Sequence, residues 1–303
     1  MQRDRCPEGR RLFPRTFGNT LPREEGLTLE ILDSWSCKRI TPRGHQPVTS
    51  FRRTGDPEVP HSLVRLSNLR RRHREPELMD APDLDPAQHI QALRALARVN
   101  RISGVAERVW HEVLHLSRRS LDRAMDQPIR LLDVACGGGD VIVDVARRAR
   151  SAGIALEVHG CDLSPVALEH ARHEAARWSV SVDFLPRDVL SEGLPTGYDL
   201  VCSSLFHHHL SHDEAVGLLK SMAATSHCVL VQDLLRGTIG YALAWLGLRL
   251  LSRSEVAHVD GPRSVRAAFS LPEVQAMAEE AHLVGAVIHR SWPERFILRW
   301  RRS

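Results

Sequence analysis

Residues 131–140 read Leu-Leu-Asp-Val-Ala-Cys-Gly-Gly-Gly-Asp, an apolar run that ends in three glycines and an acid. The apolar residues predict a buried strand, and the glycines predict a tight turn into a following helix. Bare backbone at the carboxyl end of a strand lets a ligand approach closely, and open α/β sheets bind their ligands there. An ordinary tight turn would look the same, so the function of this stretch depends on the chain around it.

Strand-like and helical patterns alternate from residue 129 to the end of the chain. The predicted strands are 129–135, 156–162, 180–185, 198–205 and 228–234, and the predicted helices are 140–150, 165–178, 213–224 and 272–282. Two further extended runs, 286–292 and 295–301, are joined by two residues, which demands antiparallel pairing. The pattern predicts an α/β fold with a mostly parallel seven-stranded sheet, an antiparallel hairpin at its end, and helices on both faces.

The first quarter of the chain differs from the rest in net charge and in hydrophobic periodicity. Residues 1–75 hold 16 Lys and Arg against 9 Asp and Glu, a net charge of +7, whereas the remainder carries −3. They show no sustained period and are predicted to be a mostly disordered, Arg-rich leader. Residues 76–127 are predicted to form a helical lid or flank, with Asp85 as a cap and Pro86 at the first helical position. Residues 128–303 then form the ligand-binding domain.

Composition narrows the class of protein. Hydrophobic residues make up 43% of the chain and charged residues 26%, as in ordinary globular proteins. No apolar run predicts a membrane span or a secretory signal, and six cysteines without a CxxC pair indicate a reducing, cytoplasmic location. The acidic balance after residue 75 argues against a nucleic-acid partner. The basic run 70–74 has three alternative interpretations. It binds RNA or anionic lipid, it is a solvated tail, or it is translated sequence upstream of an internal start at Met79.

Acids around the glycine turn indicate the charge of the ligand. Asp133 and Asp140 bracket the turn, which contains no Lys or Arg. It matches neither GxGxxG nor the lysine-containing phosphate loop, which disfavours a nicotinamide-dependent oxidoreductase. Asp162 ends the second predicted strand, where a carboxylate can accept both hydroxyls of a ribose. The two flanking carboxylates suit an adenosine ligand that carries a sulfonium and an ammonium group.

With these motifs in this order, the chain resembles the class I S-adenosylmethionine-dependent methyltransferases, in particular the ubiquinone, menaquinone and polyketide-tailoring type. Residues 133–139 resemble the first motif of that family, 198–201 resemble its fourth-strand motif, and 205–210 its LHHL-like ending. The resemblance implies a Rossmann-like methyltransferase fold and S-adenosyl-L-methionine as cofactor. The cofactor-binding residues that it implies are Asp133, Ala135, Gly137, Gly139, Asp162, Leu163, Asp188, Val189 and Ser204.

The residues after the fourth strand indicate the class of acceptor. Cys202 and the two serines that follow replace the proline-containing motif that holds exocyclic amines, so amine methylation by that route is not expected. Cys202 itself fits a buried small hydrophobe better than a nucleophile. His208 or His209 can take a proton from a phenol or enol, with structural hydrogen bonding as the alternative. Consecutive side chains at a strand end point to alternating sides, so no metal site is expected from the three histidines.

Residues 238–252 predict an apolar helix that covers this site. It is too short to span a bilayer, and Tyr241 and Trp245 are the predicted acceptor-binding side chains, with a core or dimer helix as the alternative. Residues 260–266 are predicted to be a loop from which Arg266 meets a carboxylate or phenolate. The expected function is methyl transfer to an apolar or aromatic small molecule, with O-methylation favoured over C-methylation. The alternative is a nonenzymatic S-adenosylmethionine-binding or RNA-binding regulatory protein, and a homodimer is compatible with both.

Overall fold

The computed structural model describes residues 68–119 and 127–302, and these residues form one seven-stranded sheet with its covering helices. The strand order is β3-β2-β1-β4-β5-β7-β6. The strands are β1 (Ile129–Val134), β2 (Leu156–Asp162), β3 (Asp183–Pro186), β4 (Tyr198–Ser204), β5 (Ser226–Leu234), β6 (Val287–Ser291) and β7 (Arg295–Arg301). Neighbours among β1–β5 pair in parallel, whereas β7 runs antiparallel to both β5 and β6. The predicted fold class is therefore confirmed.

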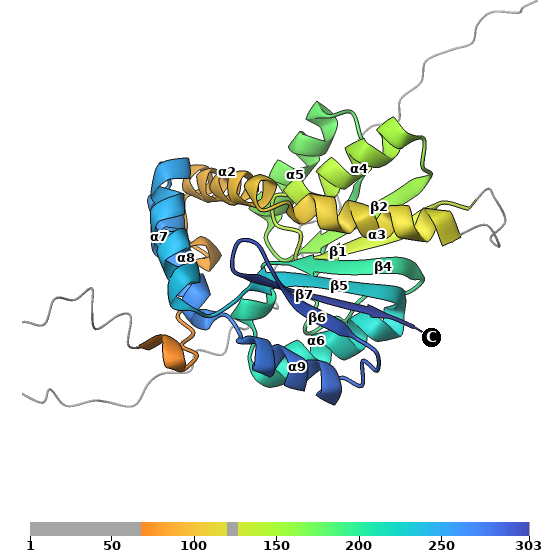
Figure 1. Ribbon diagram of the computed structural model, residues 1–303. Coiled ribbons are helices and arrows are strands. Elements are labelled where there is room, and N and C mark those ends of the chain that lie inside the picture. The colour runs from red at the N-terminus through yellow and green to blue at the C-terminus, as the bar shows by residue number, and fades with distance from the viewer. Residues whose placement is uncertain (1–67, 120–126, 303) are drawn as a thin grey trace, which may run out of the picture. The chain divides into compact units, whose positions relative to one another are not determined.

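Helices cover both faces of the sheet (Figure 1). One face carries α3 (Val105–Arg119), α4 (Asp140–Ala152) and α5 (Pro165–Arg177), and the other carries α6 (His212–Thr225) and α9 (Leu271–Glu280). Alternating residues of β1 supply both cores, since Leu131 is buried with α3 and α4 and Leu132 with α6 and α9. A sheet buried on both faces explains why its strands read as nearly continuous apolar runs.

The remaining helices form a cap at one end of the sheet. The cap consists of η2 (Leu78–Asp80), α2 (Pro86–Ile102), α7 (Thr238–Leu251) and α8 (Glu255–Ala267). The α2 helix starts as predicted, because Asp85 Oδ1 accepts hydrogen bonds from the backbone N–H groups of Ala87 and Gln88. Ala95 and Leu248 join α2 to α7 in a small buried cluster. Helices that come before β1 and after β5 in the chain thus meet in the cap.

The predicted loop 260–266 is wrong, because these residues belong to α8. The helix starts after Ser254, whose hydroxyl accepts a hydrogen bond from the N–H of Ala257 at 3.2 Å, and it continues through Pro262. Proline in a helix interior normally breaks the helix, so packing must outweigh the local preference. A Cβ at Gly261 would lie 2.0 Å from Leu248 Cδ1, and this glycine therefore lets α7 and α8 pack closely.

Residues 68–75 were expected within the disordered leader, yet the structure docks them on the domain. Arg72 is the main anchor, and its guanidinium donates hydrogen bonds to the carbonyls of His208, Leu210 and Ala267. It also lies 3.6 Å from the centre of the Phe269 ring, and burial lowers its pKa to about 10. The single side chain of Arg72 makes all these contacts, and a single residue produces no hydrophobic periodicity. The docking of this segment could therefore not be predicted from the sequence pattern. Residues 1–67 lie outside the described residues, and the prediction for them stays a prediction.

Arg72→Ala should lower the free energy of unfolding by about 2–3 kcal/mol, because three carbonyls lose a charged donor and charge-assisted hydrogen bonds are worth roughly 1.5–3 kcal/mol. Denaturant unfolding of the full chain measures the change. Arg71, the exposed neighbour, supplies the control, and Arg71→Ala should leave stability unaltered. Equal stability of the two variants would contradict the anchoring role of Arg72.

Candidate functional site

A cavity of about 970 Å³ lies between the carboxyl ends of the strands and the cap. Most of the residues predicted to bind the cofactor line it: Asp133, Ala135, Gly137, Asp162, Leu163, Asp188, Val189 and Ser204. Gly139 does not line it. A Cβ at Gly139 would lie 2.8 Å from the Ala171 Cβ, so this glycine serves the packing of α4 against α5. The strand ends and the loops after them therefore form one wall of the cavity.

The glycine turn is held open by the carboxylate that ends β2. Asp162 Oδ2 accepts a hydrogen bond from the N–H of Gly137 at 2.8 Å, and its Oδ1 accepts one from the N–H of Ser164 at 2.8 Å. Ala135 and Gly137 have φ values of 56° and 52°, in the left-handed region. A residue with a side chain is strained there by about 1–2 kcal/mol, so Ala135 keeps this conformation only because its surroundings enforce it. The turn consequently presents backbone to the cavity.

Three carboxylates, those of Asp133, Asp140 and Asp162, line the same cavity. Burial raises the pKa values of Asp133, Asp140 and Asp162, and that of Asp133 reaches about 8 with the help of the other two charges. Asp140 Oδ2 accepts a hydrogen bond from Asn100 Nδ2 at 3.2 Å. Carboxylates that resist ionisation when buried together are stabilised by a positively charged ligand. This end of the cavity therefore fits a cationic group.

Arg295, the first residue of β7, lines the same cavity and is only 2% exposed. Its Nη2 lies 3.5 Å from Asn100 Oδ1, and its Nε and Nη1 have no hydrogen-bond partner within the described part of the chain. A buried guanidinium with unused donors fits a carboxylate. The acids and Arg295 together suit a ligand that carries both an ammonium and a carboxylate. Sequence reasoning missed Arg295 and Asn100, because neither lies in a motif.

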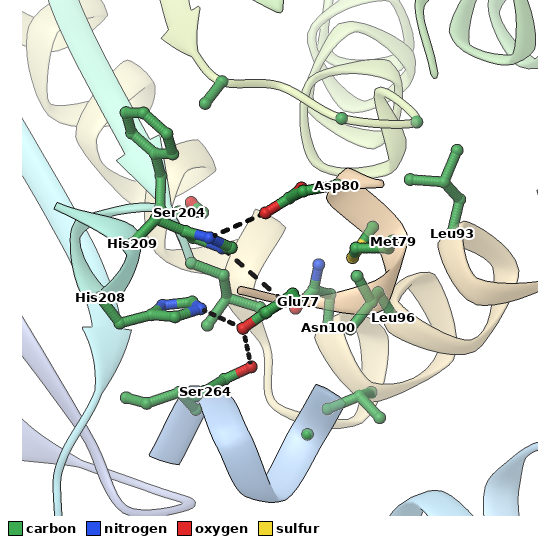
Figure 2. Close-up of a pocket in the computed structure, with 18 of the residues that line it drawn as sticks. Glu77, Met79, Asp80, Leu93, Leu96, Asn100, Ser204, His208, His209 and Ser264 are labelled. Atoms are coloured by element: carbon green, nitrogen blue, oxygen red, sulfur yellow. Dashed lines mark hydrogen bonds and ion pairs between the residues drawn. The ribbon is translucent and has the colours of Figure 1, made fainter. Parts of the chain in front are cut away.

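His207–His209 form a short 3-10 helix after β4, so the expectation of strand-like alternation is wrong. His208 and His209 both line the cavity, and Figure 2 shows both rings beside Glu77. His208 Nδ1 lies 2.7 Å from Asp233 Oδ1, and its Nε2 lies 3.4 Å from Glu77 Oε1. His209 Nδ1 lies 3.2 Å from Asp80 Oδ2, and its Nε2 lies 3.8 Å from Glu77 Oε2. Two imidazoles and three carboxylates therefore meet at the cap side of the cavity.

The surroundings of His208 favour its protonated form. Burial opposes its charge, but the carboxylates of Asp233 and Glu77 outweigh burial and raise its pKa to about 10. Burial likewise opposes the charge of Asp233, yet His208 holds the pKa of Asp233 at about 2. A cationic imidazole cannot accept a proton. Of the two histidines predicted as bases, His209 is therefore the better candidate, and the assignment stays a prediction.

Glu77 is held in place by α8. Ser264 Oγ donates a hydrogen bond to Glu77 Oε1, as Figure 2 shows, and the Asp260 carboxylate accepts from the N–H groups of Leu78 at 2.8 Å and Met79 at 3.0 Å. Burial raises the pKa of Asp260 to about 6. Sequence reasoning missed Glu77, Asp80 and Asp260, since their roles depend on α8 packing against a segment far away in the chain.

The buried pair of His208 and Asp233 should make stability depend on pH. The pKa of His208 is raised from 6.5 to about 10, so its contribution is complete below pH 6.5 and is lost as the pH rises towards 10. We expect the melting temperature of the protein to fall over that range more steeply than that of His208→Gln. Thermal unfolding at closely spaced pH values measures both slopes. Parallel slopes would contradict the ion pair.

Glu77, His208 and His209 also place possible metal-ligand atoms within 4.8 Å of one another. An ion at this position would have to displace the proton from His208, whose pKa is about 10. The prediction that the site uses no metal stays a prediction.

The cap presents a different face of α7 to the cavity than the sequence suggested. Tyr241 and Trp245 do not line the cavity, and the Trp245 ring instead lies 4.3 Å from the Arg249 guanidinium carbon. Arg266 does not line it either and pairs with Glu75 at 2.9 Å. The side of α7 that does line it is Gly240, Leu243, Ala244, Gly247, Leu248 and Leu251, opposed by Leu93, Leu96 and Val99 of α2. The hydrophobic run was recognised, but an apolar helix gives no signal for which face turns inward.

Among the described residues, no helix is both long and apolar enough to cross a membrane.

Residues 131–226 match the family model described as a methyltransferase domain. The demethylmenaquinone methyltransferase of Thermus thermophilus is 34% identical over 114 residues, 37% of this chain and 50% of that protein. The carboxy-S-adenosyl-L-methionine synthase of Nitratiruptor is 32% identical over 82 residues, 27% of this chain and 33% of that protein. The chain thus spans no more than half the length of these two relatives.

The fold matches solved methyltransferase structures. The crystal structure of the plantazolicin methyltransferase BpumL, in complex with a monoazolic desmethylPZN analog and SAH, aligns with a TM-score of 0.50 and 13% identity. The alignment covers 69% of this chain and 90% of that structure. At this identity the likeness shows the fold alone.

Proposed function

We propose that this chain, of which residues 131–226 match a methyltransferase domain, transfers a methyl group from S-adenosyl-L-methionine to an oxygen of an apolar or aromatic small molecule. The observation that supports the proposal most strongly is one cavity that joins the motif-bearing strand ends to an apolar cap and a histidine. Cofactor and acceptor could therefore meet without crossing solvent.

The residues at the strand ends fit S-adenosyl-L-methionine. We assign the ribose hydroxyls to Asp162, the ammonium and sulfonium charges to Asp133 and Asp140, and the carboxylate to Arg295. The cofactor supplies a methyl group on a positively charged sulfur, which an acceptor atom displaces in line. The three buried carboxylates explain why a cation is preferred here, and they argue against a nicotinamide dinucleotide with its two phosphates.

The cap residues orient the acceptor and exclude water. Apolar side chains of α2 and α7 line the cavity together, so an apolar molecule could be held against Leu93, Leu96 and Leu243. His209 would remove the acceptor proton, with Asp80 fixing the ring through Nδ1. Holding both reactants in a water-poor site is the main catalytic contribution that such a protein makes. The histidine favours O-methylation, because a carbon acceptor that is already nucleophilic needs no base.

Labelled S-adenosyl-L-methionine and a panel of phenols and enols of increasing apolar size test the proposal. We expect binding of the cofactor and methyl transfer to an acceptor, with the new bond on oxygen by mass spectrometry and NMR. A metabolite comparison between cells with and without the gene, searched for a gain of one methyl group, identifies the natural acceptor. Binding of the cofactor without any methyl transfer, together with tight binding of RNA, would favour a regulatory protein.

Dialysis against a chelator tests the absence of a metal from this mechanism. Turnover of the natural acceptor should not change, because the proposed proton transfer uses His209 and Asp80 alone. Activity that is lost on chelation and restored by one divalent ion would assign that ion to Glu77, His208 and His209.

A further inference from the structure

The outward side of α7 is an exposed apolar stripe. Ile239, Leu246 and Leu250 are 63%, 52% and 75% exposed, and Leu243 is 38% exposed. These four residues follow one another at intervals of four, three and four, so they lie on one face of the helix. Figure 1 shows α7 at the outer edge of the cap. Such a stripe on the protein surface marks a contact with something apolar.

Arginines lie at one end of this stripe. A groove of about 580 Å³ at the end of α7 is lined by Arg94 and Arg98 of α2 together with Arg249 and Arg253. Neither α2 nor α7 contains an Asp or Glu, although the chain after residue 75 is acidic overall. Trp245, 47% exposed, lies beside Arg249 at the border of the stripe. Four arginines and no acidic side chain therefore line the groove beside the apolar stripe.

We propose that this face, the apolar stripe with its four arginines, docks on an anionic lipid bilayer. A helix with leucines on one side, arginines beside them and a tryptophan at the border is typical of helices that lie in the membrane interface. Anionic headgroups would neutralise the arginines while the leucines enter the acyl boundary. A second copy of the chain would bring like charges together, which disfavours it as the occupant.

The stripe is continuous with the cavity. Leu243 and Leu251 line the cavity and are also 38% and 36% exposed, so apolar surface leads from the docking face into the site. The acceptor would then be a lipid-soluble molecule drawn from the bilayer. This identification of the acceptor rests on the proposed function, whereas the docking itself does not.

Co-sedimentation of the full chain with phosphatidylcholine vesicles, with or without phosphatidylglycerol, tests the docking. We expect binding that is tighter on the anionic vesicles. Leu246→Ser with Leu250→Ser should lower the partition coefficient at least tenfold on the anionic vesicles. Arg94→Gln with Arg253→Gln should lower it by about fivefold for each arginine on anionic vesicles, with little change on neutral ones.

Matched controls separate this face from the rest of the chain. Val284→Ser with Val287→Ser removes two exposed apolar side chains elsewhere, and Arg118→Gln with Arg290→Gln removes two exposed arginines. Both controls should bind like the unaltered protein, and all variants should keep their circular dichroism spectrum and cofactor affinity. Full binding by the α7 and α2 variants would overturn the proposal and leave the segment before residue 68 as the source of any lipid affinity.

Two other outcomes separate membrane docking from dimerisation and from the proposed function. A dimer without vesicles that Leu246→Ser with Leu250→Ser dissociates would show that a second copy covers the stripe, which overturns membrane docking. Vesicle binding that behaves as expected, combined with a failure of methyl transfer to every lipid-soluble acceptor, would sustain the docking and refute the proposed function alone.

Discussion

We expect replacement of His209 by Gln to lower turnover by about 10²–10³ and to leave cofactor affinity unchanged, because a positioned general base contributes roughly 10²–10⁴ to the rate. Gln keeps a similar size and can still hydrogen-bond to Asp80, but it cannot take a proton. His208 cannot substitute for it, since its own proton is held by Asp233 and Glu77. Single-turnover rates at saturating acceptor, with calorimetry for the cofactor, measure the two quantities.

A graded series of variants supports the assignment of His209. Asp80→Asn should reduce the rate less, by about tenfold, since it loosens the ring without removing the base. His212→Gln is the matched control, because His212 is exposed, pairs with Glu280 and does not line the cavity. Full activity of His209→Gln would reject the base and favour methylation of a carbon that is already nucleophilic.

Asp162→Ala is the second large effect, and it should weaken cofactor binding by about 1–3 kcal/mol, roughly 5-fold to 150-fold in the dissociation constant. The variant loses the acceptor of the ribose hydroxyls and also the two backbone hydrogen bonds that hold the glycine turn. Calorimetric titration with S-adenosyl-L-methionine measures the change, and circular dichroism checks the fold.

Two further variants give that experiment its reference points. Asp162→Asn keeps the size and one acceptor oxygen, so it should fall between the unaltered protein and Asp162→Ala. Asp183→Ala removes an exposed carboxylate from β3, outside the cavity, and should bind the cofactor normally. If Asp162→Ala keeps the original dissociation constant, the carboxylate serves only the turn.

The sheet could be predicted closely from the sequence because each strand carries its own apolar signal. The bounds of β2 and β7 match the predicted ranges, and β5 starts two residues earlier than expected. The strand β3 is shorter, since residues 180–182 pack at its start without pairing in the sheet. The course of α8 could not be predicted, because Gly261 and Pro262 favour a loop and only packing against parts of the chain far away in sequence, α7 among them, makes a helix stable there.

The residues of the site also fall into a group that could be predicted from the sequence and a group that could not. Residues at the strand ends could be named in advance, because one short motif places Asp133 and Gly137 on adjacent parts of a single turn. The other half of the cavity is assembled from elements far apart in the chain. Glu77 precedes α2 and Arg295 starts the last strand, so neither shares a local pattern with the residues it faces.

The position of β7 between β5 and β6 has a consequence for the order in which this protein folds during synthesis. β5, which contains Asp233, is left with an unpaired edge until residues 295–301 have left the ribosome. Arg295 reaches the cavity only at the same moment. The nascent chain therefore carries an open sheet edge and an unfinished cavity while the residues between β5 and β7 are being made, a state in which exposed strands invite aggregation and chaperones bind. Shortening the chain by its last strand should leave it insoluble when expressed.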